Sequence, residues 1–408
     1  MNHIETLIAK HCPNGVEFRA LGEVFHIKNG YTPSKAKKEF WENGTLPWFR
    51  MEDIRTNGRI LDDSLQHITP QAVKSSGLFS ANSIIIATTA TIGEHALITV
   101  DSLANQQFTF LVKKVNCEHL LDMKFMFYYG FILGEWCKNN VNVSGFASVD
   151  MQKFKNFQIP IPPLEIQCEI VKILDSFTEL EKELEKELEA RRKQYEYYRE
   201  KLLSFESLIN RAGGGFVKMM RLGEVAFYPK ERIGTEFLNA QNYIGVENLL
   251  QDKQGKIDSI SVPKSGNSIH YKIYDCLIGN IRPYLKKIWF SNNEGGTNGD
   301  VLLIRIKDEF KERLEAKFLY HNLASDKFFT HHNNNSKGAK MPRGDKKTIL
   351  NFQIPIPPLK VQNEVVEILD RFDKLANDIS EGIPAEIVAR KKQYEYYREQ
   401  LLTFKEMK

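Results

Sequence analysis

The sequence predicts an α+β (mixed α/β) protein in which two globular domains, in pseudo-twofold arrangement, are joined by two long antiparallel coiled-coil helices. Three observations carry this prediction. The chain of 408 residues contains one unit of about 200 residues twice. Each unit ends in a long stretch with coiled-coil spacing of its apolar residues. The segments before these ends contain short apolar runs typical of strands.

The repeat is clearest at the end of each unit, which we call the tail. The run NFQIPIPPL at 156–164 recurs unchanged at 351–359. The run ARRKQYEYYRE at 190–200 recurs at 389–399 with one Arg-to-Lys difference. The first pair of runs is offset by 195 residues and the second by 199, so the second tail carries four extra residues. A tandem duplication with a conserved tail follows.

The bodies that precede the tails differ. Beyond a shared LGEV at 21–24 and 222–225, residues 25–150 and 226–345 barely align. Near-identical tails indicate one shared structural task, and different bodies indicate one fold that reads different targets. A decayed duplication without functional meaning is the alternative. The predicted domains are 1–155 (body one), 156–210 (first helical tail), 211–350 (body two) and 351–408 (second helical tail).

Composition is that of an ordinary globular protein, with 42% apolar and 26% charged residues. No run reaches the roughly 18 apolar residues that a membrane span needs, and the N-terminus lacks a signal pattern. Five scattered cysteines without a C-x-x-C pair argue against a disulfide scaffold or a zinc site. We expect a cytoplasmic protein without a membrane partner and without a bound metal.

Charge is distributed unevenly along the predicted domains. Their net charges are +1 for 1–155, −4 for 156–210, +8 for 211–350 and −1 for 351–408. The basic second body favours a polyanionic partner, although solubility alone also accounts for such a charge. The acidic tails favour docking of proteins over binding of DNA.

The first tail is predicted to begin with a short extended segment and to continue as one long helix. Phe157 to Ile161 alternates as a strand does, and the prolines that follow exclude a central position in a sheet. From about 165 to 205 the apolar residues repeat with 4-3 spacing, which predicts a coiled-coil helix of about 60 Å. Its seam includes Ile170, Leu174, Phe177, Leu184, Leu188, Tyr195, Tyr198, Leu202 and Phe205.

The second tail repeats this seam but contains an interruption. Its four extra residues lie around Gly382-Ile383-Pro384, and such an insertion with Gly and Pro should break or kink the helix. The seam residues are Val365, Leu369, Phe372, Ile379, Tyr394, Tyr397, Leu401 and Phe404. We expect the two tails to pair antiparallel within the chain, and pairing between two molecules remains the competing possibility.

Both bodies show strands followed by a helical segment. Strands are predicted at 83–89 and 107–112 in body one, and at 275–279 and 300–306 in body two. Helices are predicted at about 118–138 and 309–329.

The predicted loops of both bodies carry side chains that suit DNA. Arg, Lys, Asn and Gln read base edges, and Lys and Arg neutralise phosphates. The clusters at 282–287 and 337–343 are the strongest, because they lie in the basic segment. For the threonines at 88–91, β-propensity at a strand end is the competing explanation. The candidate DNA-binding residues are Tyr31, Thr32, Lys35, Arg50, Arg55, Asn57, Thr89, Gln106, Lys230, Arg232, Arg282, Tyr284, Lys286, Lys287, Lys337, Lys340 and Arg343.

Signatures of catalysis are absent from the sequence. It contains no P-loop, no nucleophile elbow, no cofactor-binding glycine loop and no adenine-methylation motif N-P-P-[FY]. Gly213-Gly214-Gly215 is interpreted as a flexible junction, and His331-His332 as part of a solvated loop. These observations favour a binding module over an enzyme.

The tail motifs resemble those of a known family. The start NFQIPIPPLxxQ, through Gln167 and Gln362, and the end AR[RK]KQYEYYRExLL look like the two conserved helical regions of type I restriction–modification specificity subunits. The stretch 382–386 also looks typical of the distal region, and the bodies resemble the two target recognition domains. The resemblance covers nearly the whole chain.

This resemblance implies a subunit that performs no chemistry itself. Each target recognition domain would read one half of a bipartite asymmetric site on double-stranded DNA, while the helices act as a spacer. The implied partners are two modification (methyltransferase) subunits and two restriction (translocase) subunits. The implied cofactors, S-adenosylmethionine, ATP and magnesium, would belong to those partners.

Two alternatives remain open at this point. One is a coiled-coil scaffold with two protein-binding domains. The other is a stand-alone nuclease or methyltransferase with an unrecognised site.

Overall fold

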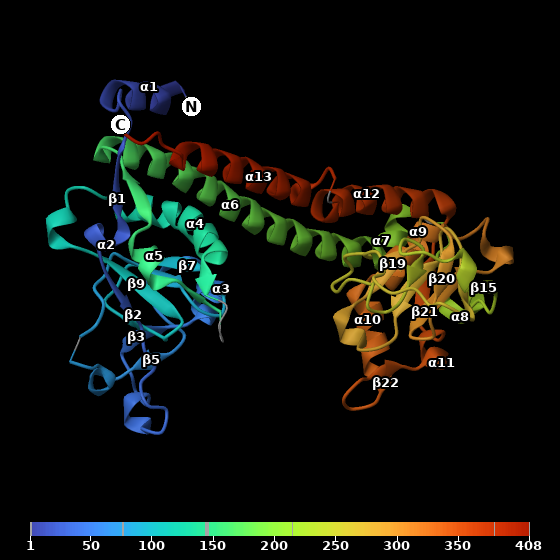
Figure 1. Ribbon diagram of the computed structural model, residues 1–408. Helices are drawn as coiled ribbons and strands as arrows, with labels where there is room; N and C mark the ends of the chain where they lie inside the picture. The colour runs from blue at the N-terminus through green and yellow to red at the C-terminus, as the bar shows by residue number, and fades with distance from the viewer. Residues whose placement is uncertain (1, 76, 143–146, 214, 379, 408) are drawn as a thin grey trace. The chain divides into compact units, whose positions relative to one another are not determined.

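The chain folds into two compact units of similar construction (Figure 1). The computed structural model describes residues 2–75, 77–142, 147–213, 215–378 and 380–407. Unit 1 comprises Met1–Lys182 and Arg390–Lys408, and unit 2 comprises Glu183–Ala389. Each unit therefore contains one body, the first part of the tail that follows this body, and the last part of the other tail.

The body of unit 1 is built on a five-stranded sheet in the order β2-β9-β6-β7-β4, with a smaller sheet β5-β3-β8. Its strands are β1 Glu17–Ala20, β2 Phe25–Asn29, β3 Leu46–Phe49, β4 Ile60–Leu61, β5 His67–Ile68, β6 Ser83–Ala87, β7 His95–Ile98, β8 Leu103–Ala104, β9 Phe108–Lys113, β10 Val141–Asn142, β11 Ser148–Val149 and β12 Gln158–Ile161. Its helices are α1 Asn2–His11, α2 Leu21–Val24, α3 Met51–Asn57, α4 Met123–Asn139 and α5 Met151–Lys155. The strands predicted at 83–89 and 107–112 correspond to β6 and β9.

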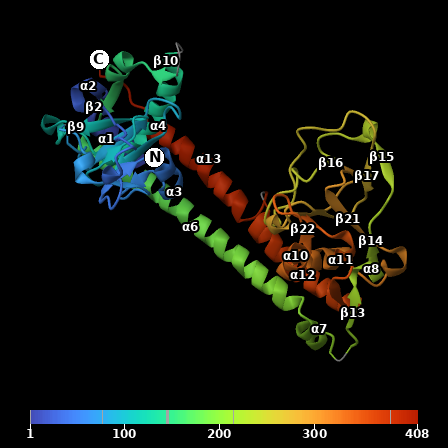
Figure 2. The same cartoon turned by 90° about the horizontal axis from the view of Figure 1, so that it is seen from below.

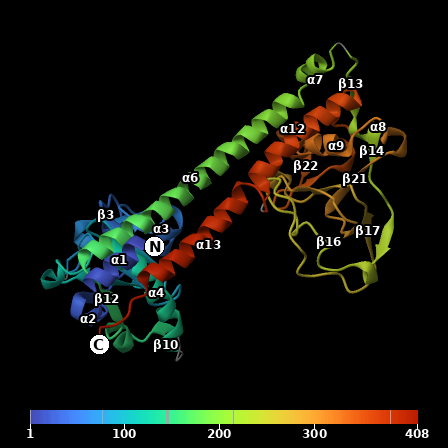
Figure 3. The ribbon, with the colours of Figure 1, turned by 90° about the horizontal axis from the view of Figure 1, so that it is seen from above.

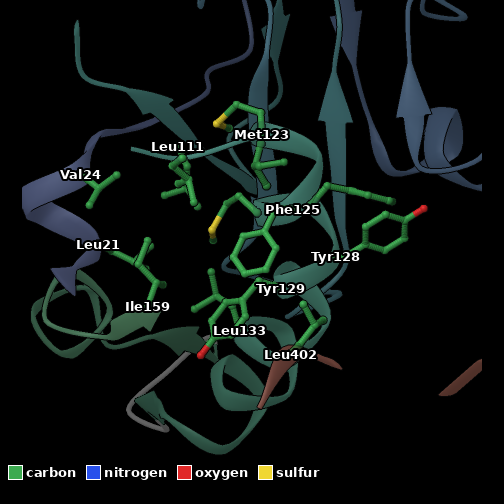
Figure 4. Packing of buried hydrophobic residues seen from close by; sticks show 14 of the residues in the cluster. Leu21, Val24, Leu111, Met123, Phe125, Tyr128, Tyr129, Leu133, Ile159 and Leu402 are labelled. Carbon is green, nitrogen blue, oxygen red and sulfur yellow. The ribbon is translucent and has the colours of Figure 1, made fainter. Parts of the chain in front are cut away.

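The central strand β6 is buried on both faces, which explains its uninterrupted apolar sequence. Ile84 and Ile86 pack into the core that α4 covers, whereas Ile85 and Ala87 pack into a second core on the opposite face. Figure 4 shows the α4 side of this core, where Phe125 and Leu133 lie near Leu402 from the end of the second tail.

Unit 2 repeats this plan with a sheet in the order β14-β21-β18-β19 and a second sheet β15-β17-β20-β16. Its strands are β13 Lys218–Arg221, β14 Ala226–Phe227, β15 Arg232–Gly234, β16 Tyr243–Ile244, β17 Asn267–Tyr271, β18 Cys276–Gly279, β19 Ile288–Phe290, β20 Gly295–Thr297, β21 Val301–Ile306, β22 Ser336–Lys337, β23 Arg343–Gly344 and β24 Gln353–Ile356. Its helices are α7 Phe205–Arg211, α8 Leu222–Val225, α9 Ala316–Leu323, α10 Asp326–Asn334, α11 Lys346–Ile349 and α12 Leu359–Asn377. The strands predicted at 275–279 and 300–306 correspond to β18 and β21.

The duplicated tail starts make the same contacts in both units. The segment before α6 (Leu164–Leu202) forms β12, which pairs antiparallel only with β1, and β24 pairs in the same way with β13. Proline is acceptable in these two-stranded sheets because it can avoid the positions that need an amide donor.

The motif glutamines explain why the tail start is repeated so closely. Gln167 is fully buried, accepts from the Asp122 amide at 2.8 Å and donates to the carbonyls of Leu120 and Pro162. Gln362 makes the equivalent three hydrogen bonds with Glu315, Arg313 and Pro357. A buried amide is tolerated only when its donors and acceptor are satisfied, so each glutamine fixes its tail helix to the start of the helix in the body.

The tails pair within the chain, as expected. In unit 1, α13 (Ile383–Leu402) lies alongside α6 (Figure 2). Phe177 of α6 lies near Tyr394 and Tyr397 of α13, with ring centroids 6.2 and 5.5 Å apart, and Lys391 pairs with Glu181 at 2.9 Å. As residue numbers rise along α6, those of its α13 partners fall, so the helices are antiparallel.

In unit 2, the same seam lies between α6 and α12. Figure 3 shows α12 alongside the end of α6. Tyr198 and Tyr195 stack on Phe372, with ring centroids 5.1 and 6.4 Å apart. Of the predicted spacer residues, those that are buried are Leu174, Tyr195, Leu202, Leu369 and Leu401, and those that are half-buried are Phe177, Leu184, Leu188, Tyr198, Phe372, Tyr394 and Tyr397.

Two of the predicted helices differ from the structure. The long helix ends at Leu202, because Ser204 caps a new helix, α7, by accepting from the Ser207 amide, and Phe205 is therefore an exposed residue outside the seam. The single helix predicted at 309–329 is divided into α9 and α10, where Ser325 caps α10. A serine oxygen that satisfies an amide at a helix start favours such breaks.

The predicted interruption of the second tail is confirmed between α12 and α13. A Cβ on Gly382 would lie 2.4 Å from the Lys374 carbonyl oxygen, so the close approach of the chain to the end of α12 requires glycine there. Pro384 falls in the first turn of α13, where its missing amide donor costs nothing. The predicted seam residue Ile379 and the middle of the predicted junction, Gly214, lie outside the described residues.

Candidate nucleic-acid interface

The strand order of unit 1 brings loops from distant parts of the body to one edge of the sheet. β9 is antiparallel to β2 and to β6, with Asn29 opposite Thr109 and Ala87 opposite Phe108. The loops after β2 and β6 and the loop before β9 therefore leave from the same edge. We call this edge the unit 1 rim and define it by residues 29–32, 50, 88–91, 105–107 and 148.

Backbone hydrogen bonds join these loops to one another. The amide of Tyr31 donates to the Ala104 carbonyl, that of Asn105 to Phe49, and that of Thr88 to Gln107, at 2.9 to 3.0 Å. Gly30 makes this possible, since a Cβ there would lie 2.3 Å from the Ala104 carbonyl oxygen. The rim is thus a rigid set of loops, which suits a surface that must hold side chains in fixed positions.

Five of the predicted DNA-binding residues of body one belong to this rim, namely Tyr31, Thr32, Arg50, Thr89 and Gln106. Thr32 and Gln106 contact each other, with Oγ1 of the threonine 2.5 Å from Oε1 of the glutamine. Thr89 pairs with Ser148 in an isolated bridge. Tyr31 is held inward, because its hydroxyl accepts from the Lys74 amide at 2.8 Å.

The other predicted residues of body one lie on α3 or on the exposed segment that follows the rim. Arg50, the fifth rim residue, directly precedes α3, and its backbone amide donates to Asp53 Oδ2 at 2.6 Å. Its side chain pairs with Glu52 at 3.0 Å, and its guanidinium lies 5.8 Å from the Trp48 ring. Arg55 and Asn57 are exposed on α3, and Lys35 is exposed beyond Thr32.

A network of the buried threonines Thr88 and Thr109 with the exposed Asn29 at the strand ends was not among the predicted residues. Thr88 Oγ1 lies 2.9 Å from Thr109 Oγ1, which donates to Asn29 Oδ1 at 2.8 Å. The threonines at 88–91 thus divide into a structural Thr88 and a half-buried Thr89. The only sequence signal for this network is a polar residue directly after or within an apolar strand, which is common in any sheet.

Unit 2 has a rim at the same edge of its sheet. β18 and β21 are antiparallel with Gly279 opposite Val301, so the loop after β18 and the loop before β21 leave together. We define the unit 2 rim by residues 280–284, 298–300 and 336–344. Ile281 bridges Arg343, and the Arg282 amide donates to the Pro342 carbonyl at 2.7 Å.

The unit 2 rim is strongly basic. Arg282, Tyr284 and Lys340 are exposed. Arg343 is 58% exposed and pairs with Asp300 at 3.0 Å, and Lys337 is 82% exposed and pairs with Asp345 at 2.9 Å. Exposed surface ion pairs contribute little energy, so both cations can exchange their partner for a phosphate at small cost.

Two predicted residues are directed away from this surface. Lys286 pairs with Asp326 at the start of α10, with 2.8 Å between Nζ and Oδ1. Lys287 donates to the Val246 carbonyl at 2.8 Å, and partial burial lowers the pKa of its ammonium. Lys230 and Arg232 are exposed around the start of β15, outside the defined rim.

The interpretation of His331 and His332 as a solvated loop is wrong. Both lie in α10, where His332 is fully buried and its Nε2 is 3.3 Å from Asn280 Oδ1. Burial lowers the pKa of His332 to about 4, and the neighbouring His331 adds to this effect. Gly344 packs directly on the ring, since a Cβ there would lie 2.1 Å from His332 Nε2. His332 thus supports the unit 2 rim from beneath.

The described residues contain no group of three or more His, Cys, Asp or Glu side chains placed to hold a metal ion. The five cysteines are free thiols. Among the helices in the described ranges, none has the length and apolar character required to cross a lipid bilayer.

Comparison with known protein families identifies the family of this chain. Residues 13–190 and 217–389 match the family described as the type I restriction modification DNA specificity domain. The chain belongs to this family. The match occurs twice, in agreement with the tandem repeat and with the two rims.

Curated members of the specificity family extend over almost the whole chain. The specificity subunit of the Escherichia coli type I restriction enzyme EcoprrI is 41% identical over 400 residues, which is 90% of each protein. A putative type I restriction enzyme specificity subunit of Haemophilus influenzae is 33% identical over 427 residues, covering 95% of this chain and 96% of the relative.

A solved structure supports the fold of this family member. A chain described under complex assembly and conformational transition of the type I R-M system matches with a TM-score of 0.59 and 16% identity. The match covers 96% of this chain and 98% of the other. This comparison confirms the mixed helix and sheet fold.

Proposed function

We propose that this chain is the DNA specificity subunit of a type I restriction–modification complex and that each unit reads one half of a bipartite, asymmetric site on duplex DNA. The observation that carries the proposal is the pair of rims. They lie at equivalent edges of equivalent sheets, in two bodies whose sequences barely align. Loops held on a common scaffold can vary without disturbing the fold.

The chemistry of the rims favours two different half-sites. The unit 1 rim presents hydroxyls and amides, among them Thr32, Thr89 and Gln106, which suit contacts with base edges. The unit 2 rim presents Arg282, Lys340 and Arg343, which suit phosphates and guanine. Two recognition domains with different surfaces would recognise an asymmetric DNA site.

The tails favour docking of two copies of one partner. The repeated motif exposes the same aromatic residue twice, as Tyr197 (59% exposed) and Tyr396 (55% exposed). Exposed tyrosines are typical anchors of protein interfaces. Two modification subunits would each bind one copy of this motif, so that one subunit would lie at each half of the site. Two restriction subunits complete the proposed assembly.

Methylation, translocation and cleavage belong, in this proposal, to the partner subunits, which would carry S-adenosylmethionine, ATP and magnesium. This part of the proposal rests on the sequence, in which no catalytic motif was recognised.

Exchange of one body tests the proposal. The variable part of body one, residues 25–150, is replaced by the corresponding segment of another member of the family. The complex is then expressed in a host without adenine methylation. Methylome sequencing should report one altered half-site and one unaltered half-site.

Alteration of both half-sites would contradict independent readers. A purified chain that shows no salt-dependent, sequence-selective binding of duplex DNA would favour the scaffold alternative. Methylation or cleavage by the chain alone, with all three cofactors supplied, would overturn the assignment of catalysis to partners.

A further inference from the structure

A group of charged side chains beside the unit 2 rim is paired around one buried lysine. Lys253 is buried, and its Nζ lies 2.6 Å from Glu196 of α6 and 3.1 Å from Asp326 of α10. Lys286 also pairs with Asp326 at 2.8 Å. We call Glu196, Lys253, Lys286 and Asp326 the clasp.

The clasp joins two loops that have an unusual backbone. Asp252 and Lys253 have φ values of 52° and 63°, and Arg282 and Lys286 have φ values of 53° and 49°. Left-handed conformations at such residues cost free energy and persist only where surrounding contacts impose them. Four of them in two touching loops indicate a geometry that the rest of the unit must maintain.

The two loops also bond to each other through the backbone. The amides of Asp252 and Lys253 donate to the carbonyls of Leu285 and Lys286, each at 3.0 Å. Between the left-handed residues Arg282 and Lys286, the turn η5 (Pro283–Leu285) exposes Tyr284. The conformation of this rim loop therefore depends on the loop that carries Lys253.

Helix α6 anchors the clasp to the tail. Glu196 accepts from Lys253 and, at 2.7 Å, from the buried Arg199. Glu200, one turn further, accepts from the Asp326 amide at 2.8 Å. Burial alone would raise the pKa of Asp326, but hydrogen bonds and charge from Lys286 and Lys253 outweigh it and lower that pKa. The carboxylate is therefore ionised at neutral pH.

We propose that the clasp is a positioning device for DNA recognition by unit 2. Lys253 and Lys286 hold the 282–287 loop against α6 and α10 in its left-handed geometry, so that Arg282 and Tyr284 meet the DNA preformed. Lys286, although basic and beside the rim, acts through this loop and not as a phosphate contact. The inference rests on the proposed function and assigns specificity to residues that do not touch DNA.

Electrostatics gives the clasp a distinctive signature. Removing an acidic group near a DNA surface ordinarily strengthens binding, because less negative charge opposes the phosphates. If Asp326 positions the loop, its neutralisation weakens binding to the specific site instead. Likewise, loss of a true phosphate contact reduces the salt dependence of binding by about one unit of slope, whereas loss of a positioning lysine leaves the slope unchanged.

The experiment uses the full chain assembled with its modification subunits and duplexes that carry the split motif found by methylome sequencing. Competitor duplexes have the unit 2 half-site scrambled. Asp326→Asn and Lys286→Met are compared with Glu312→Gln and Lys340→Met, which remove the same charges from exposed positions of unit 2. Affinities are measured at several salt concentrations, and thermal unfolding checks that each variant folds.

We expect Asp326→Asn and Lys286→Met to reduce the preference for the intact motif about tenfold, the order of one lost base contact, without a change in salt slope. Lys286→Arg, which retains the ion pair, should restore the preference. Lys340→Met should lower the slope, and Glu312→Gln should not weaken binding.

Unchanged or tighter specific binding by Asp326→Asn would contradict the proposal that the clasp positions the loop. A reduced salt dependence of DNA binding for Lys286→Met would contradict it as well. Wild-type protein that does not distinguish the intact from the scrambled duplex would instead refute the proposed function.

Discussion

Arg343 shows how the neighbours of a basic side chain decide its proposed role. It lies on β23 at the unit 2 rim, pairs with Asp300 and remains mostly exposed. Lys286 has the same charge and lies in the 282–287 loop, yet it is engaged with Asp326. Sequence reasoning assigned both to DNA, and only their partners separate them.

Replacing Arg343 or Arg282 by Ala should weaken DNA binding several-fold. Each loss should also lower the salt slope by about one, because a cation facing the phosphates is removed. Titration of a duplex at several salt concentrations provides the measurement. An affinity that is unaffected at fixed salt would remove these residues from the interface.

His332 should make the stability of unit 2 sensitive to acid. Its pKa of about 4 lies below the ordinary value of 6.5, so below pH 6.5 the unfolded chain takes up a proton that the buried ring does not. Stability is complete above pH 6.5 and falls by about 1.4 kcal/mol per pH unit between 6.5 and 4. His95, buried in unit 1 with a pKa of about 3, should add a similar loss.

Thermal unfolding at pH 7.5 and pH 5 tests this expectation. The variant His332→Gln should show a smaller difference between the two pH values than the wild type does. An identical difference in both proteins would exclude His332 as a source of the acid sensitivity.

At the scale of elements, the seam between tail helices combines stability with a surface for partners. Phe372 stacks on Tyr198 and Tyr195 inside unit 2, whereas Tyr197, next to Tyr198 in sequence, is directed outward. Adjacent residues of one helix thus have separate tasks, because successive side chains point about 100° apart.

Truncation of the seam should destabilise the protein, while truncation of the outer face should not. Phe372→Ala should cost about 2 to 3 kcal/mol, below the full cost of a buried phenylalanine because this ring is only half-buried. Tyr197→Ala should change stability by less than about 0.5 kcal/mol but weaken assembly with the modification subunits. Denaturant unfolding and co-purification measure the two effects, and equal destabilisation by both variants would contradict the division of faces.

Helix boundaries are the elements that the sequence predicted least well. Apolar periodicity continues past Ser204 and through Ser325, so it does not reveal the breaks. Each break depends on a serine that caps the next helix, and a capping serine is not distinguishable from a surface serine until the fold is known. The break at Gly382 was predictable because glycine disfavours a helix interior through its backbone freedom, and Pro384 lacks the amide donor that a helix interior needs.

At the scale of the whole molecule, each unit requires both tails. Unit 1 uses the first part of α6 and the last part of α13, and unit 2 uses α12 and the remainder of α6. Each body is fixed to its own tail by a buried glutamine, Gln167 or Gln362. The duplication of the tails is therefore a structural necessity for both bodies.

The continuous helix α6 should act as a spacer for the two half-sites. Four residues inserted near Glu183 lengthen a helix by about 6 Å, which corresponds to one or two base pairs at about 3.4 Å each. Methylome sequencing of the insertion variant should therefore report the same half-sites with a gap longer by one or two pairs. An unchanged gap would defeat the idea of a helical ruler.

The sequence by itself determined the repeat, the two main strands predicted in each body, the seam of the tails and the membership in the specificity family. These features are encoded by local periodicity and by motifs that recur along the chain. Only the tertiary structure decided which loops share a rim, that His332 is buried and that Lys286 belongs to the clasp. Many of these contacts join residues that are far apart in the sequence, as Lys286 and Asp326 are. Their pairing depends on the strand order, which no local pattern specifies.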